Sequence, residues 1–390
     1  MSTTGRNIDS LDGLRGCAVL LVVLKHLFQY YSGTNPMVQR SIAGWYLFQT
    51  GVNLFFVLSG FLLFLPYSKA AFSDRNFPST VKFSERRALR ILPAYWASLI
   101  IFVLAISLTS NSAFGAKDIG LHFVLANNLL KSTYMSINPA YWTMAIEVQF
   151  YLILPAIAVL VVSSIRRSKY WAVADIFASI GIVSVAAYAA SLFLHRIGGH
   201  FDQFVHAPEM LQYLPVFGVG MAASLCYVSA SEGPWANRNL QTVWKGLGAG
   251  GLILLGLLVV FNQVKLYHWR YGYVAIDQLS GVAYAAILLG VVLGWKSWNH
   301  ALGRRWIRFI GMISYSMYIW NLVILQDFVL PRVDRVFHGG IVNVPVGFAV
   351  GIAVIVPLSL LSYLAFERPF IGARRSRRDL QLIASRKTPG

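Results

Sequence analysis

Residues 47–66 read LFQTGVNLFFVLSGFLLFLP, a run that contains no charged side chain. A helix of that length and polarity spans the roughly 30 Å hydrocarbon core of a bilayer. The whole chain has the same character: of its 390 residues, 57% are hydrophobic and 12% are charged, and the mean hydropathy is +0.59. Soluble domains carry about 25% charged residues. The composition therefore predicts an integral membrane protein.

Ten segments are long and apolar enough to cross a bilayer, so the predicted fold is all-α, a polytopic bundle of about ten transmembrane helices. We expect the third to begin at Pro93, because proline suits the first turn of a helix. Glycines four residues apart, in the pairs Gly246/Gly250 and Gly347/Gly351, predict close helix packing. The ten segments lie at about 11–31, 47–66, 93–110, 141–163, 172–194, 209–229, 246–262, 273–294, 310–330 and 341–365.

The formal net charge of +18 comes from basic residues that lie between the apolar segments, not on a polar domain, which argues against nucleic-acid binding. With the N-terminus inside, the inner segments hold 23 lysines and arginines and the outer loops hold 8. This bias predicts that both termini lie in the cytoplasm. We expect a multi-pass protein of the plasma membrane, which in a bacterium is the inner membrane. We expect a membrane domain over residues 1–370 and a basic cytoplasmic tail over 371–390 that contacts membrane lipids. No metal-site spacing is present.

Three ionisable residues fall inside predicted helices. Inserting a charged side chain at the centre of a membrane helix costs about 2.5–3.5 kcal/mol by translocon-insertion measurements, so such residues usually mark function. Arg15 and His26 are eleven residues apart, on one face of the first helix and about 16.5 Å from each other. Glu147 lies on a helix of opposite direction. Counting from the predicted helix starts, His26 and Glu147 both lie about 9 Å below the outer boundary. The sequence therefore predicts contact between them, either as a base with its orienting carboxylate or as a structural ion pair.

A basic cluster precedes the third segment. Arg87 and Arg90 are three residues apart, hence neighbours if the stretch is helical. Paired arginines suit the phosphates of a nucleotide-like cofactor. The alternative is the ordinary positive charge of a cytoplasmic loop, which residue position alone favours.

These residues belong to five longer runs that together resemble the acyltransferase-3 family of membrane O-acyltransferases. Arg15 and His26 match its Arg-x10-His signature, and the runs follow in the family's order over nearly the whole chain. One departure is Asn321, where the family usually has histidine; asparagine can form hydrogen bonds but cannot shuttle a proton. The five runs are residues 11–26, 51–62, 87–95, 141–151 and 367–370.

The resemblance implies transfer of an acyl group from cytoplasmic acyl-CoA, most often acetyl-CoA, to a hydroxyl. The acceptor class is a sugar, a glycolipid, a surface polysaccharide or another polar metabolite. Arg15, Arg87 and Arg90 would hold the CoA phosphates. His26 would be the catalytic base and Glu147 would support its charged form.

The motif runs also supply candidate substrate-binding residues: Ser59, Tyr95, Trp142 and Asn321. A second reading of the buried charges stays open, in which the chain is a non-enzymatic permease or flippase for a glycan or lipid. That reading accounts for the helices but not for the arginine pair.

Overall fold

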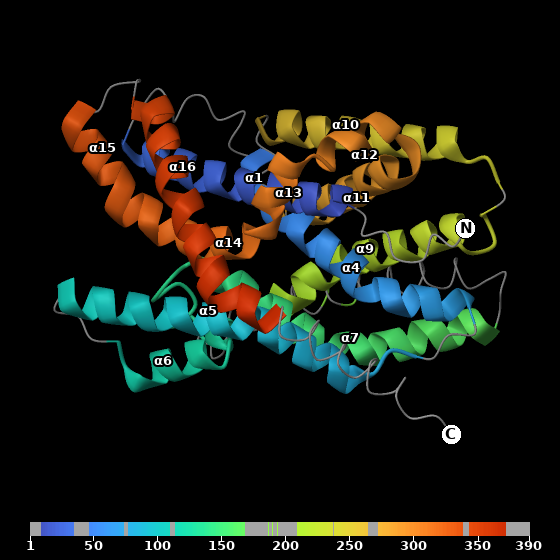
Figure 1. Cartoon of the computed structure of the whole chain (residues 1–390), viewed down its shortest axis with the longest axis horizontal. Coiled ribbons are helices and arrows are strands. Elements are labelled where there is room, and N and C mark those ends of the chain that lie inside the picture. The colour runs from blue at the N-terminus through green and yellow to red at the C-terminus, as the bar shows by residue number, and fades with distance from the viewer. Residues whose placement is uncertain are drawn as a thin grey trace, which may run out of the picture.

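The computed structural model describes residues 9–34, 47–73, 77–109, 114–167, 209–236, 238–263, 272–337 and 343–371, with positions 186, 189 and 193. Throughout these ranges the regular elements are helical (Figure 1), which confirms the all-α fold. In chain order they are α1 (Asp9–Thr34), α4 (Gly51–Phe72), α5 (Thr80–Thr109), α6 (Ala116–Phe123), η1 (Asn127–Leu129), α7 (Tyr141–Arg167), α9 (Glu209–Ser231), α10 (Gln241–Gln263), α11 (Gly272–Leu289), η4 (Gly290–Gly294), α12 (Lys296–Leu302), α13 (Arg305–Met312), α14 (Ser314–Val323), η5 (Ile324–Val329), α15 (Leu330–Phe337), α16 (Asn343–Ser362) and η6 (Tyr363–Glu367).

Within the described ranges, seven helices are long and apolar enough to cross a membrane. An eighth candidate is the segment from α13 to α15, which bends by 64° between Met312 and Ser314. The helix α1 is not among them, because its charged residues lower its hydropathy, yet its 26 residues reach about 39 Å. Apart from positions 186, 189 and 193, the predicted span at 172–194 lies outside the described residues, as does the tail from residue 372.

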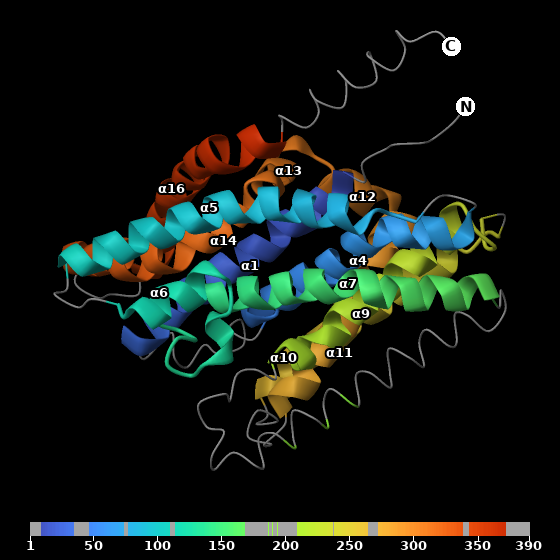
Figure 2. The same ribbon diagram turned by 90° about the horizontal axis from the view of Figure 1, so that it is seen from below.

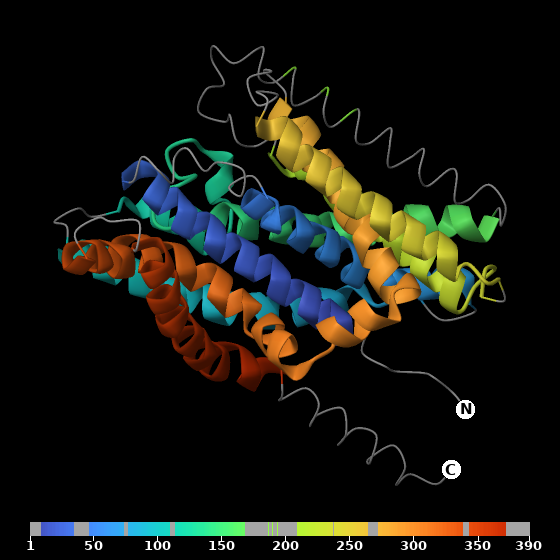
Figure 3. The same cartoon turned by 90° about the horizontal axis from the view of Figure 1, so that it is seen from above.

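The helix α1 is the central element of the bundle (Figure 3) and packs against α4, α12, α13, α14 and α16. Its contact with α13 is backbone to backbone. A Cβ on Gly311 would lie 1.8 Å from the carbonyl oxygen of Asp12, and one on Gly16 would lie 2.6 Å from that of Ile307. Enclosure by other helices explains how α1 keeps charged groups inside the protein, since ionisable side chains at membrane depth face the bundle interior.

The helices α4 and α9 touch at two reciprocal glycines. A Cβ on Gly60 would lie 2.1 Å from the carbonyl oxygen of Phe217, and one on Gly220 would lie 2.2 Å from that of Val57. Small residues at such an interface allow the backbones to approach closely, the usual way that membrane helices pack. This contact fixes the position of α4, which carries one wall of the site.

The two predicted glycine pairs have different outcomes. Gly347 and Gly351 pack against neighbouring side chains, as predicted. The prediction for Gly246 and Gly250 was wrong, because nothing lies within 4 Å of a Cβ at either position. The packed face of α10 is instead occupied by other glycines, Gly248 and Gly251, which lie on the side turned to α11 and η4.

The helix α5 begins at Thr80, so the prediction that Pro93 starts the helix was wrong. Proline is tolerated inside membrane helices because neighbouring groups satisfy the freed backbone. In the same turn of α5, the Tyr315 hydroxyl donates to the carbonyl of Ile91, two residues before the proline, at 2.9 Å. The earlier start makes Arg87 and Arg90 helical, one turn apart and on the side of α5 that faces the bundle.

Residues 114–140, which connect the third and fourth predicted spans, pack against the middle of α5 (Figure 2). The Tyr95 hydroxyl donates to the carbonyl of His122 at 2.9 Å, and the Trp96 indole stacks on Phe123 with ring centroids 4.9 Å apart. The α7 helix, which follows this segment, therefore starts deep in the protein. Its first residue, Tyr141, is fully buried and hydrogen-bonded to Ser98 at 2.8 Å.

Candidate active site

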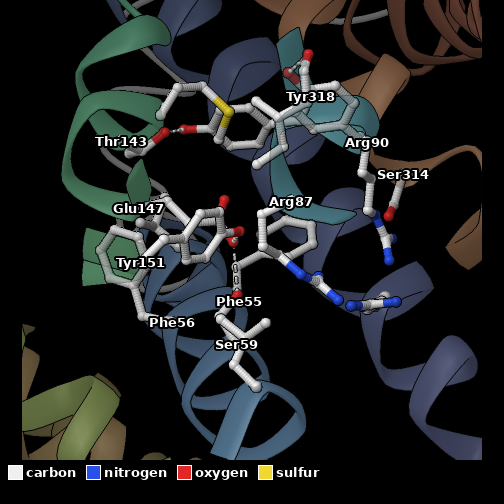
Figure 4. A pocket seen from close by; sticks show the side chains of 16 residues that line it. Phe55, Phe56, Ser59, Arg87, Arg90, Thr143, Glu147, Tyr151, Ser314 and Tyr318 are labelled. Atoms are coloured by element: carbon white, nitrogen blue, oxygen red, sulfur yellow. Dashed lines mark hydrogen bonds between the residues drawn. The ribbon is translucent and has the colours of Figure 1, made fainter. Parts of the chain in front are cut away.

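A cavity of about 670 Å³, including its open mouth, lies between α1, α4, α5, α7 and α14. The wall from α4 is mainly apolar, with Val52, Phe55 and Phe56 facing the space. Polar side chains from all five helices face it as well, and several of them are shown in Figure 4. They are Arg15, Ser59, Arg87, Arg90, Thr143, Glu147, Tyr151, Ser314, Tyr315 and Tyr318.

Three guanidinium groups, from Arg15, Arg87 and Arg90, line this cavity. Figure 4 shows those of Arg87 and Arg90 together at one end of it. Arg15 lies 3.7 Å from the carboxylate of Asp12, at the edge of ion-pair range. No carboxylate of the described residues lies within 4.0 Å of the guanidinium nitrogens of Arg87 or Arg90, and the Arg87 Nε is buried without a hydrogen-bond partner. Buried charges are normally paired. This end of the cavity is therefore built to receive an anionic ligand.

Glu147 projects into the middle of the cavity from α7. Its carboxylate accepts a hydrogen bond from the Ser59 hydroxyl at 2.8 Å and one from the Tyr151 hydroxyl at 2.5 Å. Tyr151 is one helical turn after Glu147, a spacing at which two side chains meet on a helix surface. Two donors from two helices thus hold the carboxylate in a fixed orientation.

His26 lies on α1, 6% exposed, with its Nδ1 hydrogen-bonded to the side-chain oxygen of Asn321 on α14. The amide nitrogen of Asn321 donates to the carbonyls of Met317 and Tyr318, at 2.9 and 2.7 Å. Those two carbonyls fix which end of the amide faces the imidazole, because only nitrogen can donate to them. The amide oxygen must then accept, so the Nδ1 of His26 carries the proton.

This hydrogen bond decides the chemistry of the ring. In a neutral imidazole one nitrogen carries the proton and the other is a lone-pair acceptor. With Nδ1 protonated toward Asn321, the Nε2 of His26 is the basic atom. The same partner can stay bonded when the ring becomes charged, because both nitrogens are donors in imidazolium. Asn321 thus holds His26 in the form that a general base requires.

The predicted contact between His26 and Glu147 was wrong. Their partners are Asn321 for the imidazole, and Ser59 and Tyr151 for the carboxylate; no ion pair within 4.0 Å joins the two residues.

His26 and Glu147 do not meet because α7 starts inside the protein and not at the membrane surface. The hydroxyl of Thr143 meets that of Tyr318 at 2.7 Å, which puts these two residues at one level. From there Asn321 lies three residues along α14 in one direction, and Glu147 lies four residues along α7 in the other. At 1.5 Å per residue the two levels differ by about 10 Å.

Of the other predicted substrate-binding residues, some line the cavity and some do not. Ser59 lines the cavity, whereas Tyr95 and Trp142 are not among its lining residues. The Tyr95 hydroxyl is engaged with the His122 carbonyl, and the Trp142 indole packs on Tyr213 with ring centroids 5.5 Å apart.

Several cavity residues were not among the sequence predictions, namely Thr143, Tyr151, Ser314, Tyr315 and Tyr318. A helical signal for some of them was present. Ser314, Tyr318 and Asn321 are spaced i, i+4, i+7, the pattern of one helix face.

Comparison with known protein families decides the classification, because a model described as an acyltransferase domain matches residues 8–364. The chain belongs to the acyltransferase-3 family. Membership confirms the resemblance carried by the motif runs. As a member of this family, it carries the two motif residues Arg15 and Glu147 in one cavity.

Curated relatives of this chain have names that agree with the family. A Staphylococcus aureus (strain COL) protein named "Putative O-acetyltransferase" is 25% identical over 385 residues, covering 94% of this chain and 57% of the relative. A Bacillus subtilis (strain 168) protein named "Putative peptidoglycan O-acetyltransferase" is 24% identical over 345 residues, covering 82% and 49%. The O-acetyltransferase OatA of S. aureus (strain NCTC 8325 / PS 47) is 22% identical over 344 residues, covering 82% and 51%. The chain thus spans about half the length of these relatives. No solved structure matches it.

Proposed function

We propose that this acyltransferase moves an acetyl group from cytoplasmic acetyl-CoA to a hydroxyl of a cell-envelope glycan, with His26 as the general base. The observation that carries the proposal is the arrangement of charge. Arg15, Arg87 and Arg90 line a cavity, and the Arg87 Nε is left without a partner. His26, a buried imidazole with a basic Nε2, lies on the same helix as Arg15 and outside the residues that line this cavity.

The arginine end suits the phosphates of the donor. Guanidinium groups bind phosphate through charge-assisted, often bidentate hydrogen bonds. Arg15, Arg87 and Arg90 come from the ends of α1 and α5 that the distribution of basic residues assigns to the cytoplasm, where acyl-CoA is made. With the phosphates bound there, the pantetheine arm extends along the cavity toward His26.

His26 then acts on the acceptor. Its Nε2 takes the proton of the acceptor hydroxyl while that oxygen attacks the thioester carbonyl carbon. The bond between carbonyl carbon and sulfur breaks, the acetyl group stays on the acceptor oxygen, and the imidazolium returns its proton to the departing sulfur to give CoA–SH. Asn321 keeps its bond to the Nδ1 proton throughout and stabilises the charged ring.

Glu147 cannot have the role expected for it, as the partner of the catalytic base, because it does not contact His26. We assign it to the donor arm. Its carboxylate faces the cavity between the arginines and Tyr318, where it accepts hydrogen bonds from the amide N–H groups of a pantetheine chain. Ser59 and Tyr151 hold it ready for that contact.

The acceptor class rests on the relatives, one of which carries peptidoglycan in its name. A hydroxyl of an N-acetylated sugar is accordingly the acceptor to test first. It would approach from the His26 end, opposite the arginines.

The test is transfer of labelled acetyl from acetyl-CoA to N-acetylglucosamine oligosaccharides by the purified full chain. We expect labelled ester in the wild type and loss of donor binding in Arg87→Ala. The matched control is Arg86→Ala, because Arg86 precedes Arg87 on α5, is exposed and does not line the cavity. Equal donor affinity in the two variants would contradict the assignment of the arginine end. Absence of any release of CoA by the wild type would contradict the proposed function itself.

A further inference from the structure

The helix α14 begins at the wall of the cavity. It follows α13 after a bend of 64° between Met312 and Ser314, so the two helices are not continuous. The first N–H of α14 that has a backbone acceptor is that of Met317, which donates to the carbonyl of Ile313 at 2.9 Å. No side chain caps the helix at Ile313. The N–H groups of Ser314 and Tyr315 therefore have no backbone acceptor among the described residues, as is usual at the start of a helix.

The Ser314 side chain is buried and faces the cavity. It is 4% exposed and lines the cavity, yet its hydroxyl forms no hydrogen bond with any described residue. The second serine of the first turn, Ser316, does have a partner, because its hydroxyl lies 2.5 Å from the carboxylate of Glu367. Buried polar groups of proteins are normally hydrogen-bonded. The Ser314 hydroxyl is thus the group of this turn that a ligand in the cavity can satisfy.

Positive charge lies beside the start of α14. Figure 4 shows Ser314 and Arg90 at the same end of the cavity. The residues that follow them touch, since the Tyr315 hydroxyl donates to the carbonyl of Ile91 at 2.9 Å. The buried Nε of Arg87, in the same cavity, has no hydrogen-bond partner. The start of a helix adds about half a positive charge to that of the arginines.

A phosphoryl group fits this combination of donors. Its oxygens accept hydrogen bonds from backbone N–H groups at a helix start, as in many phosphate sites, and from hydroxyl and guanidinium groups. Coenzyme A offers such groups in two places, a pyrophosphate between pantetheine and adenosine and a further phosphate on the ribose. Because Ser314 is buried inside the cavity, the phosphoryl group that reaches it is the one attached to the arm that enters the cavity.

We propose that the N-terminus of α14 and the Ser314 hydroxyl form the subsite for the phosphoryl group attached to the pantetheine arm of the donor. The inference rests on the proposed function, because it names the part of coenzyme A that this end of the cavity binds. Arg90 holds the same group from α5, and the arm continues from there past Glu147.

The experiment measures equilibrium binding of coenzyme A, dephospho-CoA and 4′-phosphopantetheine to the purified full chain, by displacement of labelled coenzyme A. All three ligands keep the phosphoryl group next to the arm, whereas only coenzyme A carries the ribose phosphate. A hydrogen bond to a charged group contributes about tenfold or more in affinity. We expect Ser314→Ala to weaken binding of all three ligands by about that factor. The matched control is Ser68→Ala, which removes a fully buried hydroxyl on α4 that is bonded to Ser224 outside the cavity.

A second substitution separates phosphate binding from a structural role. An aspartate in the first turn of a helix is stabilising, yet its charge repels a phosphate. Ser314→Asp should therefore hold or raise the thermal midpoint in detergent while the affinity for coenzyme A falls below that of Ser314→Ala.

The outcomes distinguish this inference from the proposed function. A Ser314→Ala or Ser314→Asp variant that binds coenzyme A within about threefold of wild type overturns the inference and leaves the proposed function standing. A weakening seen with coenzyme A but not with dephospho-CoA assigns Ser314 to the ribose phosphate and also overturns it, as does a failure of 4′-phosphopantetheine to displace coenzyme A from the wild type. A wild-type protein that binds no coenzyme A overturns both.

Discussion

Replacing Asn321 by leucine tests how His26 is held. Leucine is close in size but offers no acceptor, so the Nδ1 proton of His26 loses its partner inside the protein. An unsatisfied buried donor costs about 1–3 kcal/mol. The effect on catalysis is separate. A hydrogen bond to a charged group contributes about 1.5–3 kcal/mol against about 0.5–1.5 for a neutral pair, so the imidazolium of the transition state loses roughly 1–1.5 kcal/mol more than the ground state.

That difference is about tenfold in rate. Freedom of the ring to adopt the other tautomer adds to it, and loss of an outer partner of a functional histidine typically costs 10–100-fold. We expect kcat for acetyl-CoA consumption to fall 10–100-fold, with donor Kd unchanged within threefold. The control is Asn128→Leu, since Asn128 is also fully buried but pairs with Gln149, away from the cavity. If Asn321→Leu keeps kcat within threefold of wild type, the hydrogen bond does not set the state of His26.

Further expected outcomes concern the donor, the carboxylate and the helix packing. Arg87→Lys should restore only part of the donor affinity that Arg87→Ala loses, by equilibrium binding of CoA, because one ammonium cannot form a bidentate contact; full rescue would refute that contact. Glu147→Gln should raise the donor KM more than it lowers kcat in steady-state kinetics, and a fall in kcat alone would place Glu147 at the reaction centre instead. Gly60→Ala should lower the thermal midpoint in detergent because its Cβ meets a backbone carbonyl at 2.1 Å, whereas Gly246→Ala, in open space, should hold or raise it; equal midpoints would contradict the packing of α4 on α9.

The apolar spans of the fold were largely predictable from the sequence. The helices α7 and α9 begin at the predicted residues, Tyr141 and Glu209, because each follows a change from polar to apolar sequence. The start of α5 was not predictable in this way. Its first thirteen residues carry charged side chains that read as a loop, and their helical state depends on packing inside the bundle.

The candidate site was predictable by residue but not by pairing. Arg15, Arg87, Arg90 and Glu147 do line one cavity. The predicted pairing of His26 failed because the depth of Glu147 was counted from the membrane surface, whereas α7 begins inside the protein. No local pattern states that depth; it is set by residues 114–140 packing on α5. Asn321 was read as a departure from the family, and only the fold reveals it as the partner of His26.

The central claim is that the Nε2 of His26 is the general base of acetyl transfer. The most direct test is the rate of acetyl-CoA consumption by His26→Gln, with His122→Gln as the control, since His122 is also buried but is paired with Asp118 outside the cavity. General bases contribute about 10²–10⁴-fold. The account predicts a loss of at least 100-fold in kcat for His26→Gln, with donor binding and thermal stability retained and His122→Gln active. A His26→Gln variant that keeps more than a tenth of wild-type kcat would contradict it.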